Sequence, residues 1–153
     1  MSVVEDRLVA LGHELPPVAA PVAAYVPAVQ TGSLVFTSGQ LPFVAGALMG
    51  TGLVGSDVPA EEAQAMAGRC ALNALAAVRA VVGDLDRVRR VVKVVGYVAS
   101  APGFTGQPGV VNGASELLAA AFGEAGVHAR SAVGVAQLPL GAPVEVELVV
   151  EVA

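Results

Sequence analysis

Charged and aromatic side chains are scarce in this sequence. Of its 153 residues, 14% are charged and 4% are aromatic, tryptophan is absent, and Cys70 is the single cysteine. One cysteine excludes an internal disulfide and any cysteine-based zinc site. The two histidines, His13 and His128, are far apart in the chain and lack the spacing of metal ligands. We therefore expect no metal and no other cofactor.

Long apolar runs and basic clusters are also missing. No run reaches the roughly 18 uninterrupted apolar residues that a membrane-spanning helix needs. The net charge is −5, and Arg87, Arg89 and Arg90 form the one basic cluster, so neither a membrane nor a nucleic acid is expected as a partner. Glu5 and Asp6 precede any apolar run, which argues against a signal peptide and favours a cytoplasmic location.

Hydrophobic residues, by contrast, make up 55% of the chain, and its mean hydropathy is +0.71. A monomer of this composition has too little polar surface to cover it, so we expect it to bury surface against copies of itself. A length of 153 residues suits one domain with its own core. We expect a single domain over residues 1–153, in which 1–23 form an N-terminal helix and a proline-rich extension.

Periodicity, prolines and turn residues predict the order of the elements. In sequence order they are a short amphipathic helix at Ser2–Leu11, an extended connector at 15–27, a hairpin of Ala28–Thr31 and Leu34–Ser38, a weak strand around Ala47–Gly50, a long helix ending at Gly83, a strand at Val91–Ser100, a helix at Gly109–Phe122, and strands at Arg130–Gln137 and Val144–Val152. This order predicts an α+β fold with a mixed β-sheet, two helices packed on one face of it, and a short extra N-terminal helix.

The long central helix is predicted to start from a cap at Ser56 or Asp57, with Pro59 in its first turn. Its buried stripe is expected at helical spacing, at Met66, Cys70, Ala74, Val78 and Val81. Cys70 is therefore interpreted as an inert core thiol and not as a nucleophile.

The two C-terminal strands are predicted to form a hairpin around the turn at Leu138–Pro143. Glu145, Glu147 and Glu151 share one face of the second strand. In this hairpin Arg130 would face Glu151, and the two would form an ion pair; the other interpretation is that Arg130 binds a ligand carboxylate. Glu145 would lie about 20 Å from Arg130 within one chain, so a small ligand that touched both would need a second copy.

Two separated motifs carry a resemblance to a known family. Leu34 to Pro42 reads LVFTSGQLP, and Ala129 to Glu147 contains ARS, LP and VEVE in that order. Together they resemble the signatures of the RidA/YjgF family of reactive intermediate deaminases, once described as L-PSP endoribonucleases. The resemblance extends from residue 24 to the C-terminus. It implies a chorismate-mutase-like fold and a homotrimer with ligand clefts between its subunits.

The resemblance also implies an activity, the hydrolysis of enamines or imines of 2-amino acids to 2-keto acids and ammonia. Such hydrolysis needs a carboxylate anchor, a group that orients water, and acid–base help for the leaving amine, but no cofactor. By position in the motifs, Arg130 would hold the substrate carboxylate and Glu145 would position or activate the water. The other cleft residues that the resemblance implies are Tyr25, Ser38, Gly39 and Asn112.

Three further observations bear on this site. Phe104, in the loop at 101–108, is a candidate lid or pocket wall. Ala132 stands where many deaminases of the family have cysteine, and Gly134 stands where they often have glutamate.

Two other functions remain open. One is a non-catalytic binder of small carboxylates such as keto acids; the other is a ribonuclease, which the acidic balance and the lack of paired histidines disfavour.

Overall fold

The structure is a computed structural model that describes residues 2–20 and 23–153. In the described residues, the regular elements are three α-helices, three short 3-10 helices and seven strands. In sequence order they are α1 (Val3–Ala10), β1 (Ala28–Thr31), β2 (Leu34–Thr37), β3 (Phe43–Val44), β4 (Ala47–Leu48), α2 (Ala60–Val82), η1 (Leu85–Arg87), β5 (Val88–Ala99), α3 (Gln107–Phe122), η2 (Gly123–Gly126), β6 (Ala129–Val135), η3 (Pro139–Gly141) and β7 (Val144–Val152).

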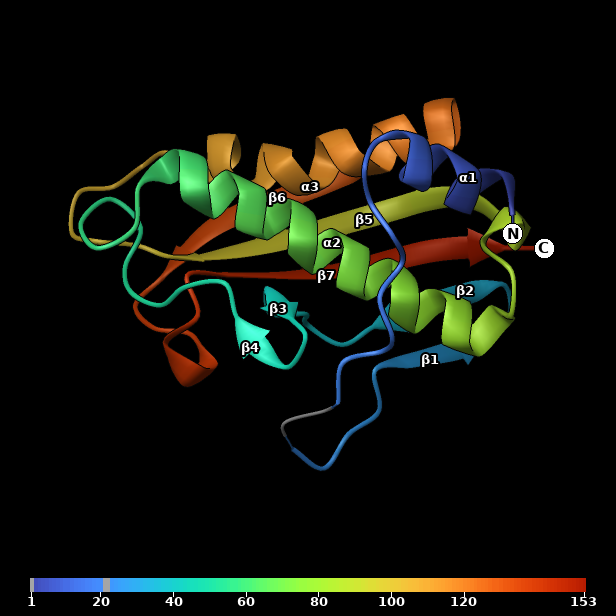
Figure 1. Ribbon diagram of the computed structural model, residues 1–153, viewed down its shortest axis with the longest axis horizontal. Helices are drawn as coiled ribbons and strands as arrows, with labels where there is room; N and C mark the ends of the chain where they lie inside the picture. Colours follow the sequence, from blue (N-terminus) through green and yellow to red (C-terminus); the bar gives the residue numbers. More distant parts are fainter. Residues whose placement is uncertain (1, 21–22) are drawn as a thin grey trace.

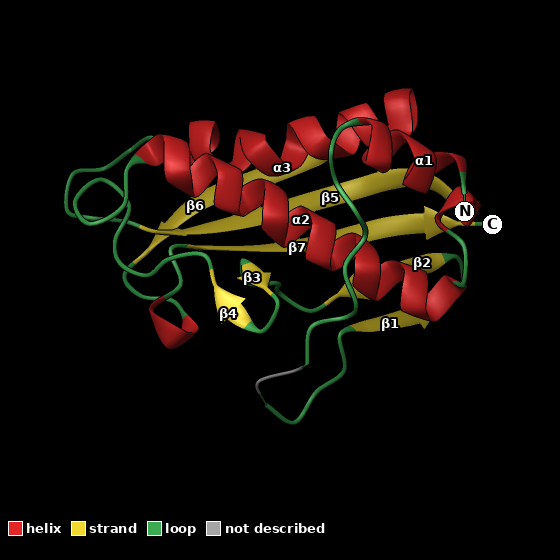
Figure 2. Ribbon diagram, viewed as in Figure 1, coloured by secondary structure: helices red, strands yellow, loops and turns green. Residues whose placement is uncertain are grey.

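Five of the strands form one mixed sheet in the order β1-β2-β7-β5-β6. All neighbours are antiparallel except β5 and β6, which are parallel. Helices α2 and α3 lie side by side across one face of this sheet, and α1 packs beside α3 (Figure 1). This confirms the predicted α+β fold, in which a mixed sheet carries two helices on one face (Figure 2).

The predicted C-terminal hairpin is wrong, because β6 and β7 are not neighbours. Strand β5 lies between them and pairs with both. In the register, Arg130 lies opposite Val94 and not opposite Glu151. The chain leaves β5 through α3 and returns as β6 parallel to β5, which is the geometry that a helical crossover imposes. The segment at 138–143 then crosses to the other side of β5, where β7 begins.

Helix α2 forms the centre of the core. Met66, Cys70, Ala74 and Val78 are buried as predicted, but Val81 is 39% exposed and its neighbour Val82 is buried instead. In the described part of the chain, α2 is the one helix whose length and hydropathy would suit a membrane span, and 67% of its most apolar window is buried inside the protein. Its apolar character is that of a core helix.

The start of α2 differs from the prediction. Pro59 is the N-cap residue, and no side chain caps this end of the helix. The carboxylate of Asp57 accepts instead from the backbone N–H of Leu53, at 2.9 Å. Asp57 therefore closes the preceding turn, because a hydrogen bond within its own loop competes with the helix for the same side chain.

The short N-terminal helix predicted from the sequence is present as α1, and polar contacts hold its N-terminal end. Ser2 and Glu5 form a capping box, with Ser2 Oγ accepting from the Glu5 N–H at 3.0 Å and Glu5 Oε2 accepting from the Ser2 N–H at 3.1 Å. The Asp86 carboxylate in η1 accepts from the next two backbone N–H groups of α1. Glu5 also pairs with Arg79 of α2, at 2.7 Å. The extension is thus fixed to the domain by polar contacts.

In the part of the chain that the structure describes, no helix covers the second face of the sheet (Figure 1). Along β7 every second residue from Val144 to Val152 is buried on the side of α2, and the residues between them, which are the glutamates and Val149, lie on the helix-free face. That face has large apolar side chains open to solvent, with Val29, Phe36 and Val133 between 44% and 53% exposed. The predicted alternation of β7 is confirmed, and its glutamates share a surface with exposed hydrophobic residues.

Candidate functional site

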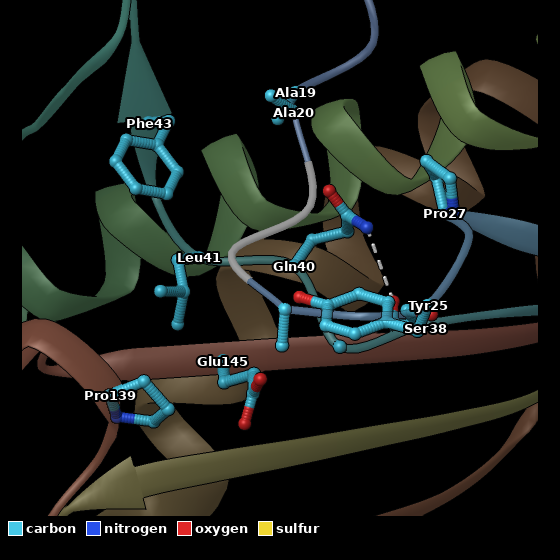
Figure 3. A pocket seen from close by; sticks show the side chains of 12 residues that line it. Ala19, Ala20, Tyr25, Pro27, Ser38, Gln40, Leu41, Phe43, Pro139 and Glu145 are labelled. Atoms are coloured by element: carbon cyan, nitrogen blue, oxygen red, sulfur yellow. Dashed lines mark hydrogen bonds between the residues drawn. The ribbon is translucent and has the colours of Figure 1, made fainter.

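A cavity of about 430 Å³ opens beside β7, between the N-terminal connector and the loop that follows β2 (Figure 3). It contains four residues predicted for the site, Tyr25, Ser38, Gly39 and Glu145. The complete lining is Ala19, Ala20, Ala23, Tyr25, Pro27, Ser38, Gly39, Gln40, Leu41, Phe43, Pro139 and Glu145. Most of this lining is apolar, and Glu145 contributes the one carboxylate, which is the usual composition of a small-molecule site.

The loop after β2 is fixed against β7 by backbone hydrogen bonds. The N–H of Gln40 donates to the carbonyl of Val146 at 2.8 Å, and the N–H of Val146 donates back to Gln40 at 3.0 Å. The Ser38 hydroxyl donates to the carbonyl of Val26 at 2.6 Å, so the same loop also holds the connector. These bonds place the Ser38–Gln40 backbone next to Glu145.

Gly39 is needed because the backbone approaches the Glu145 side chain closely. A Cβ added at Gly39 would overlap the Glu145 carboxylate and lie 2.9 Å from its Cγ. Any side chain here would displace the carboxylate from the cavity. The glycine of the SGQLP motif therefore has a physical role in the position of Glu145.

Glu145 is half-buried, and its environment disfavours the ionised form. Burial raises the pKa of the Glu145 carboxyl above its ordinary value of 4.5, and repulsion from Glu147 raises this pKa further. Glu147 itself accepts a hydrogen bond of 2.6 Å from the Tyr97 hydroxyl. That bond, together with burial, raises the pKa of Tyr97 to about 12. A carboxyl with a raised pKa in a cavity can accept and return a proton at a pH closer to neutral than an ordinary glutamate can.

Arg130 lies in a second polar cluster, between β6 and α3. Its Nη1 donates to Asn112 Oδ1 at 2.7 Å and to Ser115 Oγ at 3.3 Å, and its Nη2 donates to the carbonyl of Pro108 at 3.3 Å. The predicted pair of Arg130 and Asn112 is therefore in direct contact. The ion pair of Arg130 with Glu151 is wrong, because α3 supplies the partners of the guanidinium.

Ser115 and His128 complete this cluster, and the sequence prediction missed both. His128 Nε2 lies 2.8 Å from Ser115 Oγ, and His128 Nδ1 lies 2.6 Å from the carbonyl of Gly126. Two spacings could have revealed them. His128 is two residues before Arg130, on the same side of an extended chain, and Ser115 is three residues after Asn112, on the same side of a helix.

The two clusters lie on opposite faces of the sheet. Arg130 is aligned with Val94, which is buried on the helix-covered face, whereas Glu145 alternates with the buried valines of β7. Glu145 is aligned with Tyr97, three residues along β5 from Val94. Strands β6 and β7 are two strand spacings apart, and the two residues are offset by three positions along the strands. The Cα atoms of Arg130 and Glu145 are therefore about 14 Å apart. Within one chain, no small molecule touches both side chains.

Phe104 lies outside the Glu145 cavity. Its ring packs against Gly55 and Gly106, where an added Cβ would come within 2.9 Å of ring atoms. At Gly134, a Cβ would lie 2.8 Å from the Gln107 amide nitrogen and 3.0 Å from the Ser100 hydroxyl. These polar groups fill the space that a side chain at Gly134 would need.

Cys70 is confirmed as a core thiol. It is fully buried in α2, and burial raises the pKa of its thiol well above the ordinary value of 9.0. The nearby carboxylate of Glu145 raises this pKa further. A thiol that stays protonated is a poor nucleophile. Among residues 2–20 and 23–153, no group of three or more histidine, cysteine, aspartate or glutamate side chains comes together as a metal site.

Comparison with known proteins places this architecture in one family. The family described as "YjgF/chorismate mutase-like, putative endoribonuclease" matches residues 5–152. The protein TCP17 of Trypanosoma cruzi is 50% identical over 99% of this chain and 98% of its own length. A crystal structure from Agrobacterium tumefaciens, of a protein of unknown function, is 49% identical over 99% of this chain and 93% of that one, with a TM-score of 0.93.

A structure with lower identity carries the RidA name. The RidA protein of an Antarctic Psychrobacter species is 28% identical over 88% of this chain and 94% of that one, with a TM-score of 0.62. The motifs at Leu34–Pro42 and Ala129–Glu147, the mixed sheet and the family match over 5–152 agree with one another. The chain belongs to the RidA/YjgF family.

Proposed function

We propose that this protein hydrolyses reactive enamines or imines of small 2-amino acids to 2-keto acids and ammonia. The observation that carries the proposal is the Glu145 carboxyl, which lies in a mostly apolar cavity with a raised pKa. Water that attacks an imine carbon must lose a proton, and the leaving amine must gain one. A single carboxyl that titrates closer to neutral pH than usual can serve both transfers.

The substrate carboxylate needs a cationic partner, and Arg130 is the candidate. Its guanidinium is half-exposed and oriented by Asn112 and Pro108, so its geometry is set before a ligand arrives. Because Arg130 and Glu145 lie about 14 Å apart on opposite faces of the sheet, we propose that the working site lies between two copies of the chain. One copy would supply Arg130 and the other Glu145.

A homotrimer is the assembly that we propose for this purpose. The helix-free face of the sheet exposes Val29, Phe36 and Val133, and the chain as a whole is poor in charge. Burial of that face between copies would remove apolar surface from water. The Glu145 cavity borders the same face, so assembly would bring a neighbour to it.

The decisive experiment is a rapid assay of 2-aminoacrylate or 2-iminobutyrate hydrolysis. The imine is generated in situ, and the loss of imine and the appearance of 2-keto acid are followed with and without the protein. Faster hydrolysis that disappears in Glu145→Gln supports the proposal. Tight binding of 2-ketobutyrate with no acceleration would instead support the non-catalytic binder of small carboxylates. Cleavage of RNA without any imine hydrolysis would overturn both.

A further inference from the structure

The polar cluster around Arg130 contains a pair that imine hydrolysis does not use, Ser115 and His128. Ser115 lies on α3, and His128 lies one residue before β6. The pair is 13 residues apart in the chain and meets with 2.8 Å between Ser115 Oγ and His128 Nε2. Both side chains are half-buried and not enclosed. Each residue therefore keeps part of its surface in contact with solvent.

The tautomer of His128 follows from its partners. The carbonyl of Gly126 can only accept a hydrogen bond, and it lies 2.6 Å from His128 Nδ1, so this nitrogen carries the proton. In the neutral ring Nε2 is then the unprotonated nitrogen. The short contact with Nε2 must be an O–H of Ser115 that donates to it. His128 is thus oriented by a third group and aimed at a hydroxyl, which is the arrangement of an activated nucleophile.

Arg130 adds the third component. Its Nη1 donates to Ser115 Oγ at 3.3 Å, so the same hydroxyl contacts both Arg130 and His128. A guanidinium in contact with the hydroxyl oxygen favours the alkoxide that forms when His128 takes the proton. The positive charge of this guanidinium would also stabilise the negative charge that develops on a carbonyl oxygen attacked by Ser115.

We propose that Ser115 is a nucleophile, activated by His128, that accepts the acyl group of small carboxylic esters. Ser115 Oγ attacks the ester carbonyl carbon, its proton passes to His128 Nε2, and the carbonyl π pair becomes an oxyanion beside Arg130. The oxyanion collapses, the C–O bond to the leaving alcohol breaks, and His128 returns the proton to that alcohol. Water then attacks the acyl-serine with His128 as base, which releases the carboxylic acid and restores Ser115.

This activity goes beyond the proposed imine hydrolysis, with which it shares only Arg130, and a different assay reports it. The intact protein is treated with a small alkyl fluorophosphonate, which reacts with activated serines by loss of fluoride. Mass spectrometry of the whole protein and of its peptides then locates the adduct. We expect one adduct, on Ser115, and a slow release of p-nitrophenol from p-nitrophenyl acetate that the adduct abolishes.

Two histidine variants separate the base from the structural contacts. His128→Gln places an amide near the position of Nε2, and His128→Asn places one near the position of Nδ1, but neither can take up a proton. We expect both to slow labelling of Ser115 by at least about 100-fold. Ser100→Ala is the matched control, because Ser100 is also half-buried but donates to the carbonyl of Val98 at 2.8 Å. Labelling of this variant should equal that of the wild type.

The outcomes are distinct. An adduct on Ser115 that depends on His128 supports the proposal whether or not the protein hydrolyses imines. No adduct on Ser115 in the folded wild-type protein overturns it, and so does labelling that is equally fast in both histidine variants. If one variant fails to fold, as judged by circular dichroism, the other variant and the peptide map of the wild type still decide.

Discussion

Arg130 and Glu145 lie on opposite faces of the same β-sheet, on strands that are separated by β5. The hairpin expected from the sequence would also have separated them, but for a different reason and by about 20 Å. In the observed topology the Cα atoms of Arg130 and Glu145 are about 14 Å apart, and their side chains lie on opposite sides of the sheet. If both residues act on one substrate, two chains must provide them.

Complementation between variants tests this arrangement. Arg130→Ala and Glu145→Gln should each lack imine hydrolysis as homotrimers. After partial unfolding and joint refolding, mixed trimers should regain activity, because some clefts receive an intact arginine from one parent and an intact glutamate from the other. Light scattering should give three times the chain mass of 15.2 kDa for every sample. Mixtures that are no more active than their parents would show that the two residues do not share a cleft.

Arg130→Lys tests the carboxylate anchor. Lysine keeps the charge but loses the planar pair of N–H donors, so 2-ketobutyrate binding should weaken by about 1–3 kcal/mol. Titration calorimetry measures the difference in 2-ketobutyrate affinity between wild type and variant. Acetate, which has a carboxylate but no keto group, serves as the comparison ligand. Because Arg130 is half-exposed, the free energy of unfolding of the protein should change by at most about 1.5 kcal/mol in this variant. If the lysine variant binds 2-ketobutyrate as tightly as the wild type, the planar guanidinium of Arg130 does not anchor the ligand carboxylate and its role is structural.

Much of the fold could be predicted because it is local. The Gly32 turn, the spacing of α3 and the strict alternation of Val144–Val152 each determine one element from neighbouring residues. The partner of β6 could not be predicted in this way. A period of two identifies a strand and its two faces, but it carries no information about which strand lies beside it.

The same limit applies to the candidate site. Glu145 and Gly39 were found through motifs that each lie within a few residues of sequence. The Ser115–His128 contact joins a helix to the start of a strand 13 residues later, and it exists because α3 packs against β6. The N-cap of α2 was predicted wrongly for a related reason. The Asp57 carboxylate can accept from the start of the helix or from its own loop, and in the structure it accepts from the N–H of Leu53 in the loop.

Asp86→Asn tests how the N-terminal helix is held. Two backbone N–H groups of α1, from Val3 and Val4, donate to the Asp86 carboxylate at 2.8 and 3.0 Å, and these bonds lower the pKa of Asp86 below its ordinary value of 3.8. A lowered folded-state pKa gives stability that is present above the ordinary value and is lost as pH falls through the lowered one. The variant should therefore have a lower Tm at neutral pH.

The difference in Tm between wild type and Asp86→Asn should shrink as the pH is lowered through 3.8 and below. Thermal melts followed by circular dichroism across this range provide the measurement. Glu116→Gln removes the same charge from an exposed position on α3 and serves as the control. A difference in Tm that is constant with pH would mean that the carboxylate does not hold α1 through its charge.

Gly39→Ala tests the close approach of the SGQLP loop to Glu145. The new Cβ would overlap the carboxylate end of a flexible side chain, which can rotate away, so the fold should lose at most about 1 kcal/mol. The carboxylate would leave its position in the cavity, and a misplacement of this kind costs activity by about 100-fold. Gly109→Ala is the control, because nothing lies within 4 Å of its added Cβ. Full activity in Gly39→Ala would argue against a precise position for Glu145.

Glu145→Gln should separate activity from stability. Burial, and then repulsion from Glu147, raise the pKa of Glu145 above 4.5, so the folded state prefers the protonated carboxyl. The stability that comes from this preference is present below the ordinary pKa and is lost as pH rises through the raised folded-state value. At neutral pH the ionised Glu145 therefore weakens the fold.

Glutamine has the shape of the protonated acid and cannot ionise. At neutral pH the Glu145→Gln variant should have a higher Tm than the wild type, by the equivalent of at most about 1 kcal/mol because the side chain is half-exposed. Well below pH 4.5 the two proteins should melt at the same temperature, since the wild-type carboxyl is then protonated in both states. Imine hydrolysis should fall by about 100- to 10,000-fold. Wild-type activity should decline on the acidic side at a pH above 4.5, because the base works in its ionised form. A variant that is less stable at neutral pH, or as active as the wild type, would remove Glu145 from the proposed mechanism.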